Sequence, residues 1–288
     1  MQQAVEAGLI SIDITVPFAR SEDFYDELAF ALAPWLSRRE ELLVSARIGL
    51  GTRPRPITGF SSRWQILAGL DALLHRTGLR YLDILYVHRL APTTPVEETV
   101  DALADTVRQG KALYLGLSAL PPSSVVQVNA LLTEVGVPPV AYQASYSLMD
   151  RWLEQHALGV LNEQGLGATA CAPLAHGLLK TREESHGRDP SGSRRAIVAA
   201  LSIIARSRGQ SVEQLAVSWA LRDPRVTSAL FTTTDPRHLT SLCEAATQTA
   251  FTPTELDALN ACCPAPPQEQ WTETTDSTSP GAAERRSQ

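Results

Sequence analysis

Ionisable side chains that stand in or directly after short apolar runs could act on a bound molecule, and Asp13, Arg47 and His88 are among them. An aspartate and an arginine can form a bidentate ion pair, but an arginine keeps its proton and cannot pass it on. We therefore favour a structural ion pair between Asp13 and Arg47 over a working acid and base. His88 could donate a hydrogen bond to a substrate oxygen or pack as a neutral residue, and both readings stay open.

Three further side chains are weaker candidates for chemistry. Tyr86 has the same strand parity as His88, so it could point inward as a substitute proton donor, although a tyrosine one layer deeper is more often part of the core. His176 lies in a loop, where a histidine is usually solvated. Cys171 has no basic neighbour that the sequence predicts, so we expect a buried, unreactive thiol.

The four cysteines form no C-x-x-C pair and no His/Cys pattern with zinc spacing. This absence predicts free thiols in a reducing compartment, which is the cytoplasm, and no metal site. The first residues lack a basic region followed by an apolar core, and no apolar run approaches the roughly 18 residues of a membrane span. We therefore expect neither secretion nor membrane insertion.

The overall composition is that of an ordinary globular protein. A chain of 288 residues with 44% hydrophobic and 19% charged residues can bury a sizeable core without disulfides or metals. A formal net charge of −6 provides no basic surface for nucleic acid. We expect a small molecule as the ligand instead.

The elements that must position these side chains alternate between strand and helix patterns. Seven β-rich apolar runs lie at residues 10–15, 42–48, 82–87, 112–118, 140–146, 167–173 and 227–232. Helical spacing of apolar residues occurs at 22–36, 64–75, 96–107, 125–134 and 212–221, and Thr94 and Ser211 are typical of helix starts. Such alternation predicts an α/β fold in which crossover helices cover a parallel sheet.

Two polar segments interrupt this pattern. Residues 180–195 are rich in Gly, Ser and charge, which predicts a mobile loop at the mouth of a barrel. Residues 264–288 contain almost no apolar side chains, which predicts a disordered tail. We therefore divide the chain into one domain at 1–263 and a tail at 264–288.

Several stretches share the sequence motifs and the motif spacing of one known family. They are GLRYLDILYVHR at 78–89, PVEETVDALADTVRQGKALYLGLS at 95–118, VAYQASYSLMDR at 140–151, APLAHGLL at 172–179 and SVEQLAVSWALRDPRVTSALF at 211–231. In their order and intervals they resemble the aldo-keto reductase family, over most of residues 4–246. The resemblance implies a TIM-type (β/α) barrel whose site lies at the carboxyl ends of the strands.

Members of that family reduce carbonyls with NADPH through an Asp, Tyr, Lys and His set in which the tyrosine donates the proton. The resemblance assigns these four catalytic positions to Asp13, Phe18, Arg47 and His88. Phe18 fills the space of a tyrosine but can neither protonate nor stabilise a developing alkoxide. Arg47 keeps the positive charge of a lysine, but it cannot take part in proton transfer as a lysine can. Two of the four residue types are therefore retained.

The positions that the resemblance assigns to the cofactor are also altered. Ser118 and Gln143 match family contacts to the nicotinamide, but Ala119 replaces an asparagine and Cys171 replaces the aromatic ring that stacks on the nicotinamide. The other implied cofactor positions are Leu174, Thr232, Thr234 and His238. No glycine lets the backbone approach a phosphate, and Leu242 replaces an asparagine that binds adenine. NADPH therefore stays an open question as the cofactor, with a weakened site.

Family members carry a hairpin and a first barrel strand before the helix that corresponds to residues 4–8. This chain starts inside that helix, so the resemblance predicts about seven parallel strands in an N-terminally truncated barrel, unless the start codon was assigned too late. A barrel without its first strand exposes two strand edges. We expect a partner, a helix, the tail or a second copy of the chain to cover them.

Loss of the proton donor together with cofactor contacts leads to our first hypothesis for function. The protein would be a binding or regulatory barrel, or a non-redox enzyme for dehydration, isomerisation or cyclisation, and its arginine and alanine bias suggests natural-product biosynthesis. The alternative is a divergent NADPH-dependent oxidoreductase that acts on a carbonyl, an enone or an iminium. His88 or a substrate group would then replace the tyrosine.

Overall fold

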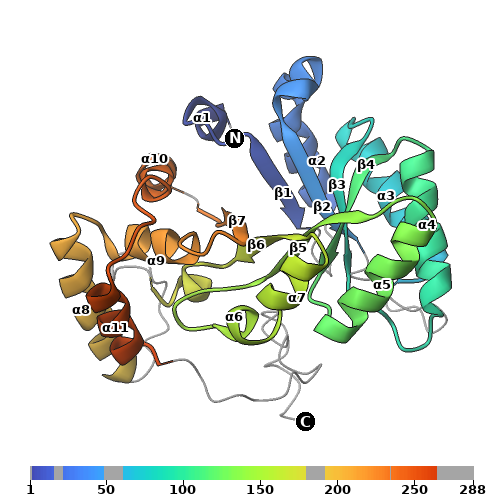
Figure 1. The fold of residues 1–288 in the computed structure, drawn as a ribbon. Coiled ribbons are helices and arrows are strands. Elements are labelled where there is room, and N and C mark those ends of the chain that lie inside the picture. The colour runs from blue at the N-terminus through green and yellow to red at the C-terminus, as the bar shows by residue number, and fades with distance from the viewer. Residues whose placement is uncertain (1, 16–21, 49–60, 180–191, 234, 265–288) are drawn as a thin grey trace, which may run out of the picture.

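Each strand of the protein pairs in parallel with the strand that follows it in the chain, which gives one seven-stranded sheet in the order β1-β2-β3-β4-β5-β6-β7. The strands are β1 (Ser11–Thr15), β2 (Leu43–Ile48), β3 (Leu82–His88), β4 (Ala112–Ser118), β5 (Pro139–Ser145), β6 (Gly167–Cys171) and β7 (Val226–Leu230). The structure is a computed structural model that describes residues 2–15, 22–48, 61–179, 192–233 and 235–264. The sheet curls into part of a barrel (Figure 1).

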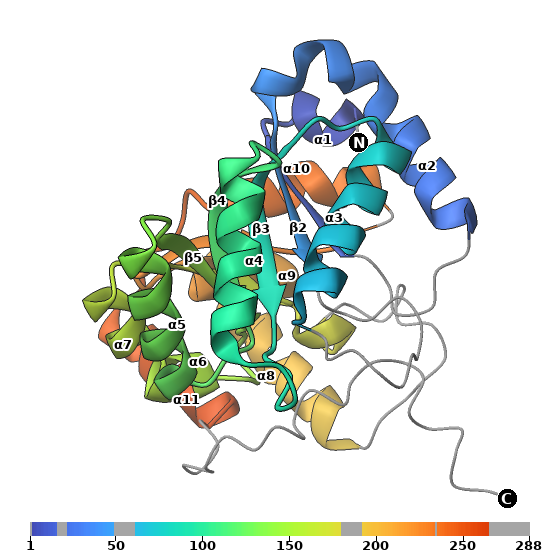
Figure 2. The same cartoon turned by 90° about the vertical axis from the view of Figure 1, so that its right-hand side faces the viewer.

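Helices cover the outer face of the sheet. They are α1 (Gln2–Glu6), α2 (Glu22–Leu32), α3 (Arg63–Thr77), α4 (Val96–Arg108), α5 (Pro122–Glu134), α6 (Trp152–His156), α7 (Leu158–Glu163), α8 (Gly192–Ser207), α9 (Val212–Ala220), α10 (Pro236–Ala245) and α11 (Pro253–Cys262). Two 3-10 helices, η1 (Ala33–Glu41) and η2 (Ala175–Gly177), complete the described helical elements. Figure 2 shows α3, α4 and α5 side by side over β2, β3 and β4.

Alternation of side chains along the strands explains the two faces of the sheet. On β2, Val44 and Ala46 are fully buried in the hydrophobic core under the helices, while Ser45 and Arg47 point to the opposite, inner face. Successive side chains of a strand face opposite ways, so polar residues at every second position line the interior. The inner face of the sheet thus carries polar groups on several strands, among them Ser45 and Arg47 on β2.

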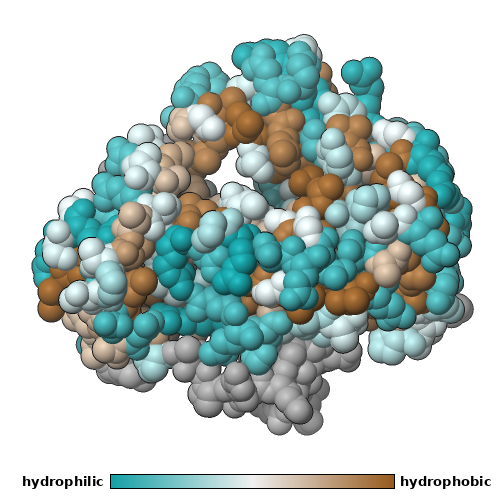
Figure 3. Space-filling view, in the orientation of Figure 1, coloured by the Kyte–Doolittle hydropathy of each residue, from teal (hydrophilic) through white to brown (hydrophobic). Residues whose placement is uncertain are grey.

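The barrel is open on one side. Within the described residues β1 and β7 each pair with a single strand, and no pairing joins them to one another. The short helix α1 contacts α10 above this side. The space-filling view shows an opening through the molecule there, edged by apolar atoms (Figure 3). The predicted seven-stranded, open α/β barrel is confirmed.

Two local predictions need correction. The helix predicted at 22–36 ends as α-helix at Leu32 and continues as η1, because Pro34 cannot donate the next helical hydrogen bond. Thr94 is not a helix cap, since its N–H closes a turn on Ala91 and Pro95 takes the N-cap position. Ser211, by contrast, caps α9 in a capping box with Gln214.

The two polar segments fall largely outside the described residues. The predicted loop at 180–195 is helical from residue 192 onward, where α8 begins, and residues 180–191 are not described. Of the predicted tail, residues 265–288 are not described. In the part of the chain that is described, no helix combines the length and the apolar character that a membrane span requires.

Candidate functional site

Backbone strain marks the carboxyl ends of the strands. Among the described residues, five other than glycine have positive φ angles, and each follows closely after β3, β4 or β6: Arg89, Ala119, Ala172, Ala175 and His176. Such conformations are unfavourable for residues with a Cβ atom, and they concentrate at functional sites. We therefore take the mouth of the barrel, where the family resemblance implies a site, as the candidate site.

Asp13 and Arg47 meet on the inner face of β1 and β2. Asp13 accepts a hydrogen bond from Ser45 Oγ at 2.7 Å, and its other carboxylate oxygen lies 3.7 Å from Arg47 Nη2. The same Nη2 donates to Thr15 Oγ1. The ion pair that we predicted is present, but it consists of one long contact and is not bidentate. Only 3% of the Asp13 side chain is exposed, so the carboxylate is held by protein groups.

His88 and Ser118 lie beside each other at the ends of β3 and β4. His88 Nδ1 is 3.2 Å from Ser118 Oγ, and both residues are buried. Gln143 follows in register on β5, directly opposite Ser118. Its Oε1 atom is buried, and no hydrogen-bond donor reaches it from the described residues. A buried acceptor without a donor is unfavourable, and an N–H group of a ligand would satisfy it.

The nicotinamide end of NADPH fits this arrangement. Its carboxamide carries two N–H donors, and Gln143 Oε1 and Ser118 Oγ are the acceptors that the neighbouring strands offer. Ala119 keeps a positive φ of 51°, a conformation that asparagine adopts more readily than alanine. Cys171 ends β6 and is half-buried, but it offers no ring face for stacking. The carboxamide contacts are therefore better preserved than the stacking contact.

The other end of the dinucleotide fits less well. Thr232 is exposed after β7, and His238 is half-buried on α10. Leu242, also on α10, is buried in the hydrophobic core and offers no polar group for adenine. Leu174 is buried at the mouth next to η2. Phe18 and Thr234, which the sequence analysis assigned to the proton-donor and phosphate positions, lie outside the described residues.

Sequence reasoning singled out Tyr86 but missed two further hydroxyls beneath these residues, those of Thr169 and Ser228. Tyr86 is buried, and the Thr169 side chain on β6 interacts with its hydroxyl and acts to lower its pKa against the larger effect of burial. Thr169 Oγ1 is in turn 3.0 Å from Ser228 Oγ on β7. Burial raises the pKa of Tyr86 to about 12, so the phenol stays neutral at physiological pH. Thr169 and Cys171 are two residues apart on one strand, so their side chains face the same side of the sheet. This spacing could have identified Thr169 as a neighbour of Tyr86.

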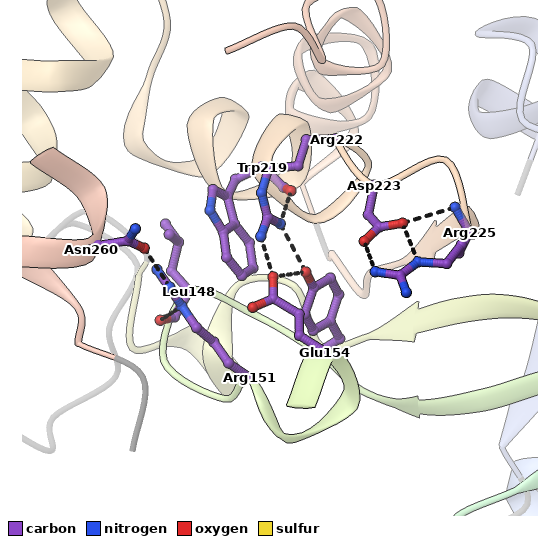
Figure 4. A network of polar contacts seen from close by, with 9 residues as sticks. Leu148, Arg151, Glu154, Trp219, Arg222, Asp223, Arg225 and Asn260 are labelled. Carbon is purple, nitrogen blue, oxygen red and sulfur yellow. Dashed lines mark hydrogen bonds and ion pairs between the residues drawn. The ribbon is translucent and has the colours of Figure 1, made fainter. Parts of the chain in front are cut away.

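A second polar network lies beyond the end of β5 (Figure 4). Arg222 contacts Glu154 and donates to Tyr146 Oη at 2.8 Å, and Tyr146 Oη also donates to Glu154. The guanidinium carbons of Arg222 and Arg151 lie 3.7 Å and 4.8 Å from the centre of the Trp219 ring. Burial raises the pKa of Tyr146 and lowers the pKa of Arg151. This network joins α6 to α9 and supports the loop that follows β5.

The described residues contain no group of three or more His, Cys, Asp and Glu side chains that could hold a metal ion. The four cysteines form no disulfide. The arrangement at the mouth therefore consists of hydrogen-bonding side chains, one ion pair and one accessible thiol. It can bind and orient a polar small molecule.

Comparisons with known proteins agree with this architecture. A profile of the Aldo/keto reductase family matches residues 1–263. The chain is 34% identical over 280 aligned positions to the L-glyceraldehyde 3-phosphate reductase of Escherichia coli K12, covering 89% of this chain and 80% of that protein. It is 31% identical to a probable voltage-gated potassium channel subunit beta of Oryza sativa over 80% of this chain and 75% of the relative. A putative channel subunit beta of Schizosaccharomyces pombe is also 31% identical, over 70% of this chain and 64% of its own length.

Proposed function

Because the chain belongs to the aldo-keto reductase family, we propose that its barrel binds a small molecule at the mouth but does not carry out the ordinary NADPH-dependent carbonyl reduction of that family. The observation that carries this proposal is the setting of Arg47. Its guanidinium contacts Asp13 and Thr15, and an arginine keeps its proton throughout the physiological pH range. Arg47 therefore cannot accept and return a proton as a lysine can.

The sequence supports the same proposal at the proton-donor position. Phe18 lacks the hydroxyl that would protonate an alkoxide, so hydride transfer to an ordinary ketone would leave an unstabilised negative charge. Chemistry without net reduction does not meet this obstacle. Binding alone, dehydration, isomerisation and cyclisation of a small molecule are the functions that we favour, in a natural-product pathway.

A second candidate function follows from Gln143. Its buried, unpartnered Oε1 is the acceptor that the nicotinamide carboxamide needs, and Ser118 lies opposite it. When bound, NADPH would supply a hydride. Gln143 and Ser118 would orient the carboxamide, and His88 would donate a hydrogen bond to an activated carbonyl, an enone or an iminium. An L-glyceraldehyde 3-phosphate reductase among the relatives adds weight to this candidate.

Titration with NADPH distinguishes the two candidates. Fluorescence of the cofactor reports binding, and Gln143→Met serves as the matched variant because it removes the acceptor while keeping the side-chain size. Micromolar binding that Gln143→Met weakens at least tenfold would favour the oxidoreductase. Binding that is undetectable, or equally weak in both proteins, agrees with the first proposal.

Restoration of the missing catalytic groups tests the first proposal directly. We expect Phe18→Tyr combined with Arg47→Lys to recover little NADPH-dependent reduction of L-glyceraldehyde 3-phosphate, because the stacking and adenine contacts are altered as well. The single Arg47→Lys variant is the control for changes at the ion pair alone. Robust turnover by the double variant would contradict the proposal.

The open side of the barrel supports a proposal about partners. We expect a strand-forming segment of another chain, a second copy included, to pair with the free edge of β1 or β7. Sedimentation of the purified protein between about 1 and 100 µM tests the second copy, and a monomer throughout would exclude it. The four free cysteines support a cytoplasmic location, which cell fractionation would test.

A further inference from the structure

The thiol of Cys171 lies at the mouth of the barrel, and the proposed function does not use it. Cys171 ends β6, and the sequence predicts a buried, unreactive thiol at this position. The structure instead leaves Cys171 half-buried and outside any disulfide. Its carbonyl oxygen accepts a hydrogen bond from the N–H of Tyr146, just after β5, at 3.0 Å. The residue is therefore held in place with part of its surface exposed.

The side chain of Cys171 faces the interior of the barrel. On the same strand, Ala168 and Ala170 are fully buried in the hydrophobic core under the helices. Successive side chains of a strand face opposite ways, so Cys171, one position further, faces inward. The same alternation on β5 places Tyr142 in the core and Gln143 on the inner face. Cys171 and Gln143 therefore share one face of the sheet.

Gln143 supplies a second, independent observation at this face. It pairs in register with Thr169, which lies two residues before Cys171. Strands about 4.8 Å apart, with a rise of about 3.3 Å per residue, place the Cα atoms of Gln143 and Cys171 about 8 Å from each other. Only 1% of Gln143 is exposed, and its Oε1 has no donor among the described residues. A buried acceptor of this kind favours a ligand that brings an N–H group.

Ser118 adds a hydroxyl beside this acceptor. It lies opposite Gln143 on β4, and its Oγ is 3.2 Å from His88 Nδ1. A hydroxyl can donate one hydrogen bond and accept another. A primary carboxamide bound here can give an N–H to Gln143 Oε1 and receive the hydrogen bond of Ser118 on its oxygen. Cys171 lies two residues further toward the mouth, so the carbon chain of such an amide can extend to the thiol.

We propose that Cys171 is a site of covalent addition for α,β-unsaturated carboxamides, and that Gln143 positions the amide. The inference rests on the proposed function in one respect, that a small molecule enters the mouth. The S–H bond of Cys171 breaks, and an S–C bond forms on the β carbon of the alkene. The π bond of the alkene breaks, and its α carbon takes a proton from water in place of the one that the thiol released. No oxidant or reductant is consumed.

Rates of thiol modification test this proposal in the intact protein. Acrylamide is the probe, because it carries both a carboxamide N–H group and an alkene. N,N-dimethylacrylamide is the matched reagent without an N–H group. Methyl methanethiosulfonate also lacks an N–H group and reports how accessible and reactive each thiol is. Digestion and mass spectrometry give the rate at each cysteine. Cys243 on α10 is the internal control, because it is half-buried as well.

The quantity to compare is the acrylamide rate divided by the methyl methanethiosulfonate rate at the same thiol. We expect this ratio to be at least about fivefold higher at Cys171 than at Cys243, because a buried acceptor gains a donor during the addition. The Gln143→Met variant should lose the preference, and N,N-dimethylacrylamide should show none. Equal ratios at the two thiols, or a preference that survives in Gln143→Met or with N,N-dimethylacrylamide, would overturn the proposal.

The same measurement separates this proposal from the proposed function. Reaction of Cys171 with methyl methanethiosulfonate at a rate similar to that of Cys243 shows that small molecules enter the mouth, whichever acrylamide ratio is found. A Cys171 that none of the three reagents modifies would contradict both the covalent addition and the entry of a small molecule. NADPH is not added, so the result does not depend on any redox activity.

Discussion

Substitution of Gly116 by alanine should destabilise the protein, although the same change stabilises most regular elements. The added Cβ atom would lie 2.3 Å, 2.4 Å and 3.0 Å from three carbons of the Tyr86 ring. Ordinary carbon contacts begin near 3.5 Å, so the ring would have to move by about 1 Å. The same move would displace the Tyr86 hydroxyl, which interacts with the Thr169 side chain.

The expected magnitude follows from two opposing effects. Overpacking of a tight interior costs about 1–3 kcal/mol. Removal of glycine from a strand returns about 0.5–1 kcal/mol through the unfolded chain. The midpoints of these two ranges give a net loss of about 1 kcal/mol in the free energy of unfolding.

Urea unfolding followed by tryptophan fluorescence measures this loss. The matched control is Gly159→Ala on α7, where a built Cβ atom meets nothing within 4 Å, and this change should stabilise the protein by about 1 kcal/mol. The double variant Gly116→Ala with Tyr86→Leu removes the ring and should show a favourable coupling of at least about 1 kcal/mol. A Gly116→Ala protein as stable as the wild type would refute the packing that places the phenol next to Thr169.

Four further predictions concern the mouth and its support. Gln143→Met should stabilise the ligand-free protein by about 1 kcal/mol in urea unfolding, because it removes a buried unpartnered acceptor, and a loss of stability would show that Oε1 has an internal donor. Ala119→Gly and Ala119→Asn should each raise the free energy of unfolding by about 1 kcal/mol through relief of the positive φ, and only asparagine should also strengthen NADPH binding. Glu154→Gln should lower the melting temperature and cost about 3 kcal/mol, since it leaves Arg222 without its carboxylate, and a change below 1 kcal/mol would contradict this. Because burial raises the pKa of Tyr86 to about 12, and an unfolded tyrosine titrates near 10, the neutral phenol stabilises the fold below pH 10 and this contribution disappears as the pH rises through 12. Urea unfolding at pH 9 and pH 12 should therefore show a loss of up to about 2.7 kcal/mol in the wild type beyond that in Tyr86→Phe, and equal losses would argue against the shift.

The sequence predicts the strands well because their alternation is strong. Every second residue of β2 is apolar and packs under the helices, and the predicted and observed ends of the strands differ by two residues or fewer. The break after Leu32 was missed because an apolar periodicity continues through Trp35 and Leu36, while the proline between them changes the hydrogen bonding. Helix type near a proline depends on the backbone more than on the apolar pattern.

The candidate residues could be named from the sequence, but most contacts between their side chains could not. Strand order places Asp13 on the strand next to that of Arg47, two positions from direct register, and His88 directly beside Ser118, so neighbouring strands already predict these pairs. The interaction between Tyr86 and Thr169 crosses two intervening strands, and no local pattern predicts which side chain is long enough to cross. The Arg222 and Glu154 pair likewise joins residues that are 68 positions apart. Such contacts depend on how the whole sheet curls.

The succession of the strands has a consequence for how the molecule is made. Each strand after β1 pairs with the strand synthesised immediately before it. The sheet can therefore form strand by strand, from β1 to β7, during synthesis of the chain. Pairing of successive strands loses less loop entropy than pairing of the first strand with the last would lose. The contact between α1 and α10 joins helices from the two ends of this series. It can form only after α10 has been synthesised.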